Sequence, residues 1–451
     1  MARLFGTDGV RGVANSELTC ELALNIGRAA AYLLTREGHH KARILIGKDT
    51  RMSSDMLENA LAAGICSVGA DAVLLGVVPT PAVAYLTRKY GADAGIVISA
   101  SHNPMEFNGI KIFNKEGFKL ADSMEDEIEA LIADIANSVP YKTHSEIGVV
   151  PRADSAVDDY VDYIISCMDG DLSGLRVAFD CANGAAVEPA QKLFTRLGAE
   201  CFFTAIEPDG SNVNRGVGST HLENIKKLTT ENGCHIGIAF DGDADRCLAV
   251  DENGNDIDGD KIIAIFAKYL KEQGKLAKNT AVVTVMTNMG FMEYCKSFGV
   301  KAVRTAVGDR YVLEEMRKEG YSIGGEQSGH IIMLEHSTTG DGELTAALLL
   351  QTLKNAGCKA SELAGELKRY PQVLVNVRTT AEGKAKFKED EELAGFIESQ
   401  QQDLFDEGRV LVRLSGTEPL IRIMVEGKSE ERINEVAELI EKKVKTRIPA
   451  V

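Results

Sequence analysis

Residues 42–76 read ARILIGKDTRMSSDMLENALAAGICSVGADAVLLG. The stretch opens with an apolar run at 42–47, continues with an amphipathic segment at 54–68, and reaches Gly69-Ala70-Asp71 before a second apolar run at 72–76. Apolar residues spaced at about 3.6 positions predict a helix, and the glycine ends it before the next strand. The stretch is therefore predicted to be one βαβ unit, in which a helix connects two parallel strands.

The same pattern recurs twice along the chain. The second copy lies at 175–206, with a helix ending near Leu197, and the third lies at 280–306, with a helix running through Phe298. Three copies of one supersecondary unit predict three similar α/β domains, each with a mixed or parallel sheet covered by helices.

Each copy is followed by a further apolar strand, predicted at 94–99, 235–240 and 321–324, and then by an unusual polar loop. The loops are Ser101-His102-Asn103-Pro104, Asp241-Gly242-Asp243-Ala244-Asp245-Arg246 and Gly325-Glu326-Gln327-Ser328-Gly329-His330. In sheets of this kind, ligands bind beyond the carboxyl ends of the strands. The three loops are therefore expected to face one shared cleft.

The last eighty or so residues lack the repeat. Strands are predicted at 373–377, 410–414 and 420–425, and an amphipathic helix is predicted at 429–445. Its inward positions are Ile433, Val436, Ala437 and Ile440. This order predicts a smaller α+β domain, and the whole chain is expected to form four domains, at 1–152, 153–256, 257–370 and 371–451. A further helix is predicted at 123–136, capped by Ser123.

Composition narrows the class of protein. A chain of 451 residues is long enough for about three domains, and 44% hydrophobic with 26% charged residues is ordinary for a globular protein. The net charge of −17, without any run rich in Lys or Arg, argues against a nucleic-acid partner. No apolar run is long enough for a membrane span, and nine scattered cysteines without a CxxC pair fit reduced thiols. The cytoplasm is the expected compartment.

Asp241, Asp243 and Asp245 form the first chemical motif. Carboxylates at alternate positions of a tight loop can converge on one hard divalent cation, although the same pattern also occurs in solvated acidic turns. A calcium EF-hand is the sharper rival, because Glu252 falls at its twelfth position. It is rejected because Arg246 occupies the sixth position, where that loop needs glycine, and because the flanking segments read as strands.

Ser101 forms the second motif. A serine at the end of a strand can accept a phosphoryl group when a base or a metal ion assists its hydroxyl. The alternative is a simple turn in which Ser101 and Pro104 serve backbone geometry alone. Lys111, in Asn108-Gly109-Ile110-Lys111, adds a cation that can neutralise a phosphate or carry a proton, or that is merely solvated.

Other polar groups resemble parts of a phosphosugar site. Arg413-Leu414-Ser415-Gly416-Thr417-Glu418-Pro419, followed by Arg422, gathers guanidinium, hydroxyl and backbone donors into a possible anion cradle, and an ordinary turn is the alternative. The loop at 325–330 offers groups suited to sugar hydroxyls, with His330 a possible proton carrier. Arg11 and Gly308-Asp309-Arg310 are weaker candidates of the same kind.

The motifs at 101–104, 241–246, 325–330 and 413–419, taken together and in their order along the chain, resemble those of the α-D-phosphohexomutase family. The resemblance covers essentially all 451 residues. Phe5–Gly12, the form of the loop at 325–330 and Thr338-Thr339-Gly340-Asp341-Gly342 are most like the bacterial branch that acts on glucosamine phosphates. The resemblance implies four domains around a central cleft and a homodimer. It also implies interconversion of glucosamine 6-phosphate and glucosamine 1-phosphate, which serves UDP-N-acetylglucosamine and cell-wall synthesis.

The resemblance also implies residue roles. Ser101 would carry a phosphoryl group, and one Mg²⁺ per chain would bind Asp241, Asp243, Asp245 and an oxygen of that phosphoserine. A sugar 1,6-bisphosphate would be both the intermediate and the primer. The candidates for catalysis beside Ser101 are Lys111, His330, Arg11, His102 and Arg246. The candidates for substrate binding are Glu326, Ser328, Gly308, Asp309, Arg310, Arg413, Ser415, Gly416, Thr417 and Arg422.

Three other functions stay open at this point. A sister mutase acting on glucose or mannose phosphates would share every catalytic part and differ only in how the substituent at C2 is read. A phosphatase would hydrolyse the Ser101 ester instead of passing the phosphoryl group to a sugar. A phosphosugar sensor would need a cradle but neither an acceptor nor a metal loop, so the presence of all three argues against it.

Overall fold

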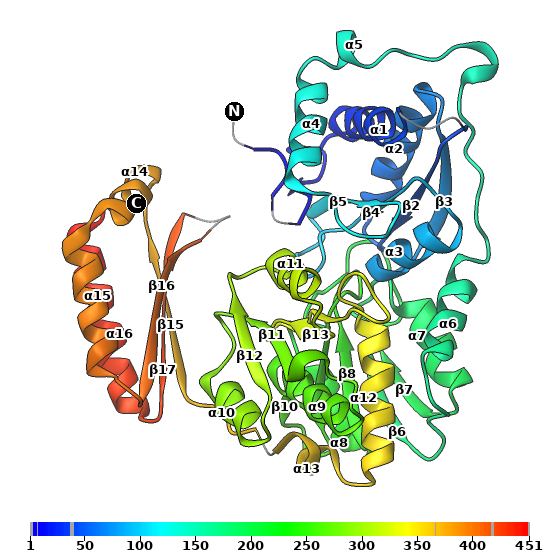
Figure 1. Ribbon diagram of the computed structural model, residues 1–451. Helices are drawn as coiled ribbons and strands as arrows, with labels where there is room; N and C mark the ends of the chain where they lie inside the picture. The colour runs from blue at the N-terminus through cyan, green and yellow to red at the C-terminus, as the bar shows by residue number, and fades with distance from the viewer. Residues whose placement is uncertain (1–2, 7, 37–39, 366, 416–418, 450–451) are drawn as a thin grey trace. The chain divides into compact units, whose positions relative to one another are not determined.

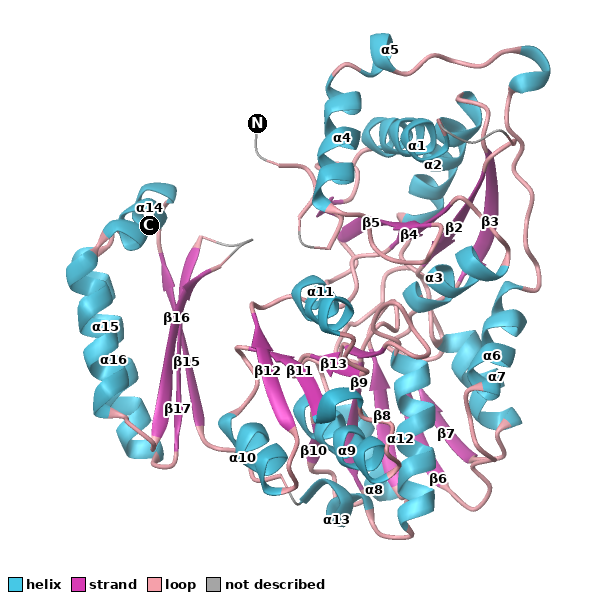
Figure 2. Ribbon diagram, viewed as in Figure 1, coloured by secondary structure: helices cyan, strands magenta, loops and turns pink. Residues whose placement is uncertain are grey.

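The computed structural model describes residues 3–6, 8–36, 40–365, 367–415 and 419–449 (Figure 1). The chain forms two compact units. The first comprises Met1–Met286 and Phe298–Glu366, and the second comprises Thr287–Ser297 and Leu367–Val451. Helices and strands alternate through most of the first unit (Figure 2), as the repeated βαβ pattern predicts.

The first sheet has the strand order β1-β5-β4-β2-β3. Its strands are β1 (Val10–Val13), β2 (Arg43–Lys48), β3 (Asp71–Val77), β4 (Ala94–Ile98) and β5 (Phe107–Asn114). β2 pairs in parallel with β3 and β4, whereas β5 runs antiparallel to β4 and β1. The helices around it are α1 (Cys20–Thr35), α2 (Ser54–Ser67), α3 (Thr80–Lys89), α4 (Asp122–Ala133), α5 (Ile135–Ser138) and the 3₁₀ turn η1 (His144–Glu146).

Helices cover both faces of this sheet. Ile44 of β2 is buried in a core that also contains Ile26 of α1. Leu45 points to the opposite face, because successive side chains of a strand alternate. On that face a Cβ on Gly47 would lie 2.5 Å from the side chain of Val83 in α3. Burial on both faces explains why the strand is a continuous apolar run in the sequence.

Two further sheets complete the first unit. The second sheet has the order β10-β9-β8-β6-β7, and the third has the order β12-β11-β13-β14. The segment that forms the second sheet comprises α6 (Ala156–Ser166), β6 (Arg176–Asp180), α7 (Val187–Arg196), β7 (Glu200–Thr204), α8 (Glu223–Glu231), β8 (Ile236–Phe240), β9 (Cys247–Asp251) and β10 (Asp256–Ile257). The segment that forms the third sheet comprises α9 (Gly259–Glu272), η2 (Ala277–Asn279), β11 (Thr280–Thr284), β12 (Lys301–Thr305), α11 (Asp309–Glu319), β13 (Ile323–Gly325), β14 (Ile331–Met333), α12 (Gly342–Ala356) and α13 (Ala360–Gly365).

The three sheets share one topology, which confirms the predicted repeat. In each sheet, the first strand of the copy (β2, β6 or β11) pairs in parallel with two neighbours, and the third strand then turns back into an antiparallel partner. The turn-back pairs are β4–β5, β8–β9 and β13–β14. The three polar loops predicted from the sequence therefore occupy equivalent positions in the fold.

The second unit is an antiparallel sheet of order β15-β17-β16 with helices packed against it. Its elements are α10 (Met289–Ser297), β15 (Gln372–Arg378), α14 (Ala381–Glu389), α15 (Glu391–Asp403), β16 (Gly408–Leu414), β17 (Leu420–Gly427) and α16 (Glu430–Arg447). The four inward positions predicted for the closing helix are all buried, and the Ser429 side chain caps it by accepting from Arg432 N. Two helices between β15 and β16 were not predicted.

The third copy is divided between the two units. Its helix, α10, follows Asn288, whose side-chain Nδ2 donates to Tyr370 O at 3.0 Å and to Glu426 Oε2 at 3.2 Å. Both partners belong to the second unit. These two hydrogen bonds explain why α10 packs there instead of with the strands that flank it in sequence.

The predicted cap at Ser123 is wrong. α4 begins at Asp122, and Ala121 precedes it with extended backbone. Ser123 therefore lies inside the first turn. The helix ends at Ala133, and α5 follows as a separate short turn from Ile135. An ion pair stabilises this end of the helix in place of the predicted cap: Arg3 lies 2.9 Å from the carboxylate of Asp122.

Candidate active site

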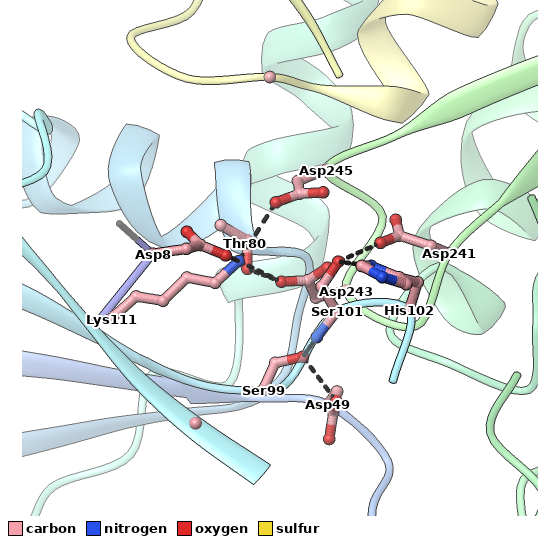
Figure 3. A network of polar contacts seen from close by, with 12 residues as sticks. Asp8, Asp49, Thr80, Ser99, Ser101, His102, Lys111, Asp241, Asp243 and Asp245 are labelled. Atoms are coloured by element: carbon pink, nitrogen blue, oxygen red, sulfur yellow. Dashed lines mark hydrogen bonds and ion pairs between the residues drawn. The ribbon is translucent and has the colours of Figure 1, made fainter. Parts of the chain in front are cut away.

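Ser101 lies just beyond β4, and its backbone is in the left-handed region with φ 54°. The side chain is buried, and Oγ donates to Asp241 Oδ2 at 2.6 Å (Figure 3). Its amide donates to Ser99 Oγ at 2.9 Å, and His102 Nδ1 lies 3.4 Å from the Ser101 hydroxyl. Residues other than glycine adopt this backbone region at a cost of about 1–3 kcal/mol, so neighbouring contacts must hold it.

Two residues absent from the motifs above hold this loop. Asp49 and Arg51 follow β2, and both side chains are fully buried. Asp49 Oδ2 accepts from Ser99 Oγ at 2.6 Å and from Arg51 Nε at 2.7 Å. Arg51 also donates to backbone carbonyls of the loop. The signal in the sequence was their position after a predicted strand that is parallel to β4, since both carboxyl ends then lie at one edge of the sheet.

Asp241, Asp243 and Asp245 lie in the equivalent loop between β8 and β9, and all three are buried. One oxygen from each of them lies within 4.8 Å of the others. The loop meets the serine loop backbone to backbone, because a Cβ on Gly242 would lie 2.7 Å from Ser101 O. The predicted serine and the predicted carboxylates therefore share one site.

The three carboxylates fit a divalent metal ion. Asp243 Oδ1 and Asp245 Oδ1 are buried and have no hydrogen-bond partner among the described residues. Burial and the charges of Asp245 and Asp243 raise the pKa of Asp241 well above its usual range. A hard cation with oxygen ligands would satisfy these oxygens and offset their mutual repulsion.

Lys111 of β5 is the main positive charge beside the aspartates. Its Nζ lies 2.9 Å from Asp243 Oδ2, 3.2 Å from Asp245 Oδ2 and 3.3 Å from Asp8 Oδ2. Burial lowers the pKa of Lys111, but Asp243, Asp8 and Asp245 outweigh burial and raise it well above its usual range. Lys111 is therefore an ammonium in this structure. Arg11 is a second cation nearby, and it pairs with Asp8.

His102 and Arg246 flank the same loops. Arg246 N donates to Asp241 Oδ1 at 3.2 Å, and its Nε lies 3.8 Å from Asp245 Oδ1. Burial, with the charges of Arg246 and Arg11, lowers the pKa of His102 to about 4. His102 is therefore neutral at pH 7. Because the serine hydroxyl gives its one proton to Asp241, a hydrogen bond between His102 Nδ1 and Ser101 Oγ would have the imidazole as donor.

His330, at the end of the third equivalent loop, also reaches this site. Its Nε2 accepts from Gly340 N at 3.2 Å and lies 3.4 Å from Asp309 Oδ2 and 4.0 Å from Asp245 Oδ2. Asp309 in turn lies 2.5 Å from Lys119 Nζ. The three predicted loops thus meet around the acidic cluster.

Gly308 follows β12, and Glu326 and Ser328 follow β13, so all three lie at the carboxyl-terminal edge of the third sheet. Glu326 Oε1 accepts from Gly308 N at 3.0 Å, and Ser328 lies in the loop between β13 and β14. Burial and Asp309 raise the pKa of Glu326. Arg310 differs, because it turns towards α4, where its NH2 donates to Leu120 O at 2.7 Å.

The candidate anion cradle belongs to the second unit. Arg413 and Arg422 are direct partners on β16 and β17, so their side chains project from the same face. Ser415 follows β16, and its carbonyl accepts from Lys384 Nζ at 2.7 Å. Gly416 and Thr417, also predicted to bind phosphate, lie outside the described residues.

Four family models match the chain. They are described as phosphoglucomutase/phosphomannomutase alpha/beta/alpha domain I at residues 2–138, domain II at 158–254, domain III at 258–370, and the C-terminal domain at 374–443. The models follow the order of the sheets described above. The domain boundaries drawn from the sequence stay predictions.

Comparison with known proteins points the same way. A protein of Clostridium tetani named phosphoglucosamine mutase is 55% identical over 449 residues, which cover 99% of this chain and all of that protein. A crystal structure of a phosphoglucomutase/phosphomannomutase family protein from Burkholderia thailandensis matches with a TM-score of 0.82 at 25% identity, covering 99% of this chain and 98% of that chain. The Aspergillus fumigatus N-acetylphosphoglucosamine mutase, solved with GlcNAc-6P and magnesium, shares the fold at 17% identity and a TM-score of 0.68, covering 98% and 96%. The chain therefore belongs to the phosphoglucomutase/phosphomannomutase family of phosphohexomutases, and it resembles phosphoglucosamine mutases along its whole length.

Proposed function

We propose that the protein interconverts glucosamine 6-phosphate and glucosamine 1-phosphate through a phosphoserine at Ser101 and a sugar 1,6-bisphosphate intermediate. The observation that carries the proposal is the 2.6 Å contact between Ser101 Oγ and Asp241 Oδ2, beside a cluster of three buried aspartates. The 55% identity to a phosphoglucosamine mutase over the whole chain supports the amino sugar as substrate. The product then serves UDP-N-acetylglucosamine and cell-wall synthesis.

Two phosphoryl transfers make up one turnover. In the first, the bond between phosphorus and Ser101 Oγ breaks as a bond from phosphorus to the sugar O1 forms; the O1 proton passes to a base, and the freed serine oxygen takes up a proton. In the second, Ser101 Oγ gives up that proton as it takes back the phosphoryl group, the bond between phosphorus and O6 breaks, and O6 takes up a proton. The intermediate turns over between the steps, and one serine serves both.

Asp241, Asp243, Asp245 and an oxygen of the phosphoserine would hold one Mg²⁺. When bound, the ion supplies positive charge against the phosphoryl oxygens during transfer. The support on the protein side is the pair of buried oxygens, one on Asp243 and one on Asp245, that have no hydrogen-bond partner within the described part of the chain. Arg246 and Arg11 add fixed positive charge nearby.

Lys111 and His330 are the proposed proton-transfer residues. Lys111 is suited to neutralise the charge of a phosphoryl group, because its neighbours keep it an ammonium, and it could donate a proton only after those carboxylates release it. His330 presents Nε2 towards Asp309 and the acidic cluster. His102, which is neutral and 3.4 Å from the serine hydroxyl, is placed to orient that hydroxyl in the unphosphorylated enzyme.

The remaining candidates are proposed to bind the substrate. Sugar hydroxyls are assigned to the loop between β13 and β14 and to the start of α11, at Glu326, Ser328, Gly308 and Asp309. Arg310 remains a candidate for substrate binding, although its guanidinium pairs with Leu120 O and Asp122. The phosphate that is not reacting is assigned to Arg413, Ser415, Gly416, Thr417 and Arg422. The support is the cluster of donors at the ends of β16 and β17.

A specificity assay tests the proposed function. The kcat/KM for glucosamine 6-phosphate is measured beside those for glucose 6-phosphate and mannose 6-phosphate, with glucose 1,6-bisphosphate as primer. We expect the amino sugar to be preferred by at least about tenfold, which corresponds to about 1.4 kcal/mol in transition-state binding. A preference for either neutral sugar would assign the protein to a sister mutase, and release of inorganic phosphate faster than isomerisation would make it a phosphatase.

Location and assembly are part of the same proposal. Within the described ranges, no helix is both long enough and apolar enough to cross a bilayer. We infer a cytoplasmic enzyme, because its proposed substrate and primer are phosphorylated sugars. We also infer a homodimer, which the molar mass of the purified protein by light scattering would test.

A further inference from the structure

The serine loop is held in a conformation that its own sequence does not favour. Ser101 has φ 54°, and Ser, unlike Gly, loses free energy in this region. The conformation sets the direction of the side chain, because it places Oγ against Asp241. Whatever stabilises this backbone therefore also fixes where the phosphoryl acceptor points.

Arg51 uses every N–H of its guanidinium group beneath this loop. Nε donates to Asp49 Oδ2 at 2.7 Å. One terminal nitrogen donates to Pro104 O at 2.5 Å and Phe107 O at 3.0 Å, and the other donates to Ser101 O at 2.8 Å and Asn103 O at 2.9 Å. A guanidinium has five donors in a rigid fork, and here all five are engaged.

A second residue approaches from the loop between β7 and α8. Asn214 Nδ2 donates to Ser101 O at 2.8 Å and to Asn103 O at 3.1 Å. Asn214 is itself buried. The carbonyls of Ser101 and Asn103 are thus each held from two sides, by Arg51 and by Asn214.

We propose that Arg51 is a positioning residue for phosphoryl transfer, supported by Asn214, and that it fixes the Ser101 hydroxyl by holding four carbonyls of the loop 101–107. The inference rests on the proposed function. Arg51 is fully buried, so it reaches no substrate and acts only through the loop. Asp49 orients the guanidinium and, through Ser99, also holds the Ser101 amide.

Positioning matters twice in each turnover. The same Oγ must be the leaving atom in one transfer and the attacking atom in the other, and each transfer needs the reacting atoms in line. A displacement of about 1 Å at a reacting atom can cost about 100-fold in rate. Binding of the sugar does not depend on this alignment, so KM should change little.

The test is Arg51→Lys. Lysine keeps a positive charge near Asp49 but has a single nitrogen, which cannot reach four carbonyls in the planar geometry of the fork. We expect kcat to fall by about 100-fold with KM within about threefold of the original value. We also expect the rate at which glucose 1,6-bisphosphate phosphorylates Ser101, followed by intact mass, to fall by a similar factor.

The matched control is Arg28→Lys. Arg28 is also buried and donates to a single carbonyl, Val139 O, at 2.8 Å, away from the serine loop. We expect both variants to lose thermal stability and only Arg51→Lys to lose phosphorylation rate. Equal losses of kcat in the two variants at equal melting temperatures, or a loss at Arg51 that lies in KM, would overturn the proposal.

A second variant keeps the question decidable if Arg51→Lys does not fold. Asn214→Asp retains the size and the tolerance for positive φ (58° at this residue) but replaces the donor with an acceptor. We expect kcat to fall at least about tenfold with KM unchanged, and an unaltered kcat would contradict the positioning role of Arg51 and Asn214. If the unmutated protein itself fails to isomerise glucosamine 6-phosphate, it is the proposed function that fails, and not the positioning role.

Discussion

Ser101 and the aspartates opposite it both stand in arrangements that cost free energy. The serine has left-handed backbone, and three carboxylates lie buried close together. Buried charges of one sign are stable only with compensating partners, which Lys111 and Arg246 supply in part. The residues that carry the proposed chemistry therefore cost stability by themselves.

Replacing Ser101 with alanine removes the phosphoryl acceptor and little else. We expect turnover to fall by at least about 1,000-fold, because no other described hydroxyl donates to Asp241, and the phosphorylated form to disappear from the intact mass. The melting temperature should stay within a few degrees. Ser166→Ala, at the end of α6, is the control. Substantial residual turnover in Ser101→Ala would remove the serine from the mechanism.

Glu343 predicts a dependence of stability on pH. Its side chain is fully buried, neither carboxylate oxygen has a hydrogen-bond partner among the described residues, and burial and Asp341 raise its pKa well above the usual range. The folded protein then keeps a proton that the unfolded chain releases above about pH 4.5. The contribution of Glu343 to stability should therefore fall by about 1.4 kcal/mol per pH unit above that pH, until its folded-state pKa is reached.

Glu343→Gln removes this titration while keeping the shape of the protonated side chain. We expect the variant and the original protein to melt at similar temperatures at pH 5, and the variant to be more stable at pH 8. Glu362→Gln, on the surface, should show no such trend. A difference in melting temperature that does not grow with pH would show that Glu343 ionises freely in the fold.

At the scale of elements, the site depends on how closely the loops after equivalent strands approach one another. Gly242 shows this most directly, because a Cβ there would lie 2.7 Å from Ser101 O and 2.9 Å from Asn214 Nδ2. Backbone oxygens cannot yield as flexible side chains do. The separation between the serine loop and the loop Asp241–Asp245 is therefore set by the absence of a side chain at Gly242.

Gly242→Ala should push the two loops apart. We expect kcat to fall by about 100-fold, since the acceptor and the carboxylates move relative to each other, and the melting temperature to fall as well. Gly395→Ala, in α15, is the control. A Cβ at this position meets nothing within 4 Å, and alanine stabilises a helix by about 1 kcal/mol relative to glycine. Retention of full activity by Gly242→Ala would show that the loops adjust without loss.

Sequence patterns predict some elements better than others. The strands of the repeats and the inward face of α16 were predicted because apolar spacing marks them strongly. α14 and α15 were missed, since their apolar positions are few and much of their surface is exposed. The prediction of a cap at Ser123 was wrong, because serine is a common capping residue but the helix already begins at Asp122.

At the scale of the molecule, an ion bound by Asp241, Asp243 and Asp245 would stabilise the whole folded chain, because its ligands come together only on folding. We expect EDTA to abolish turnover and lower the melting temperature, and Mg²⁺ to restore both, because an ion that binds only the folded state stabilises it. Asp243→Ala should lose most of the melting response, whereas Asp209→Ala, at an exposed turn, should keep it. A melting temperature that is insensitive to Mg²⁺ would contradict a magnesium site here.

The sequence predicted which loops meet but not what holds them. The Ser101 and Asp241 loops were placed together because they follow equivalent strands, and their hydrogen bond agrees with that placement. Asp49 and Arg51 were not found, since a buried Asp–Arg pair has no spacing that separates it from a solvated one. The inclusion of α10 in the second unit was also beyond prediction, because it depends on tertiary hydrogen bonds of Asn288.

The equivalence of the three turn-back loops has a consequence for how such a protein can evolve. The proposed acceptor, metal ligands and sugar contacts each occupy one copy of a threefold repeated scaffold, at β4–β5, β8–β9 and β13–β14. Mutations in the third loop can therefore change which sugar is accepted while the chemistry of the other two copies is inherited intact. Descendants of one ancestral gene can in this way diversify in substrate without having to invent phosphoryl transfer again.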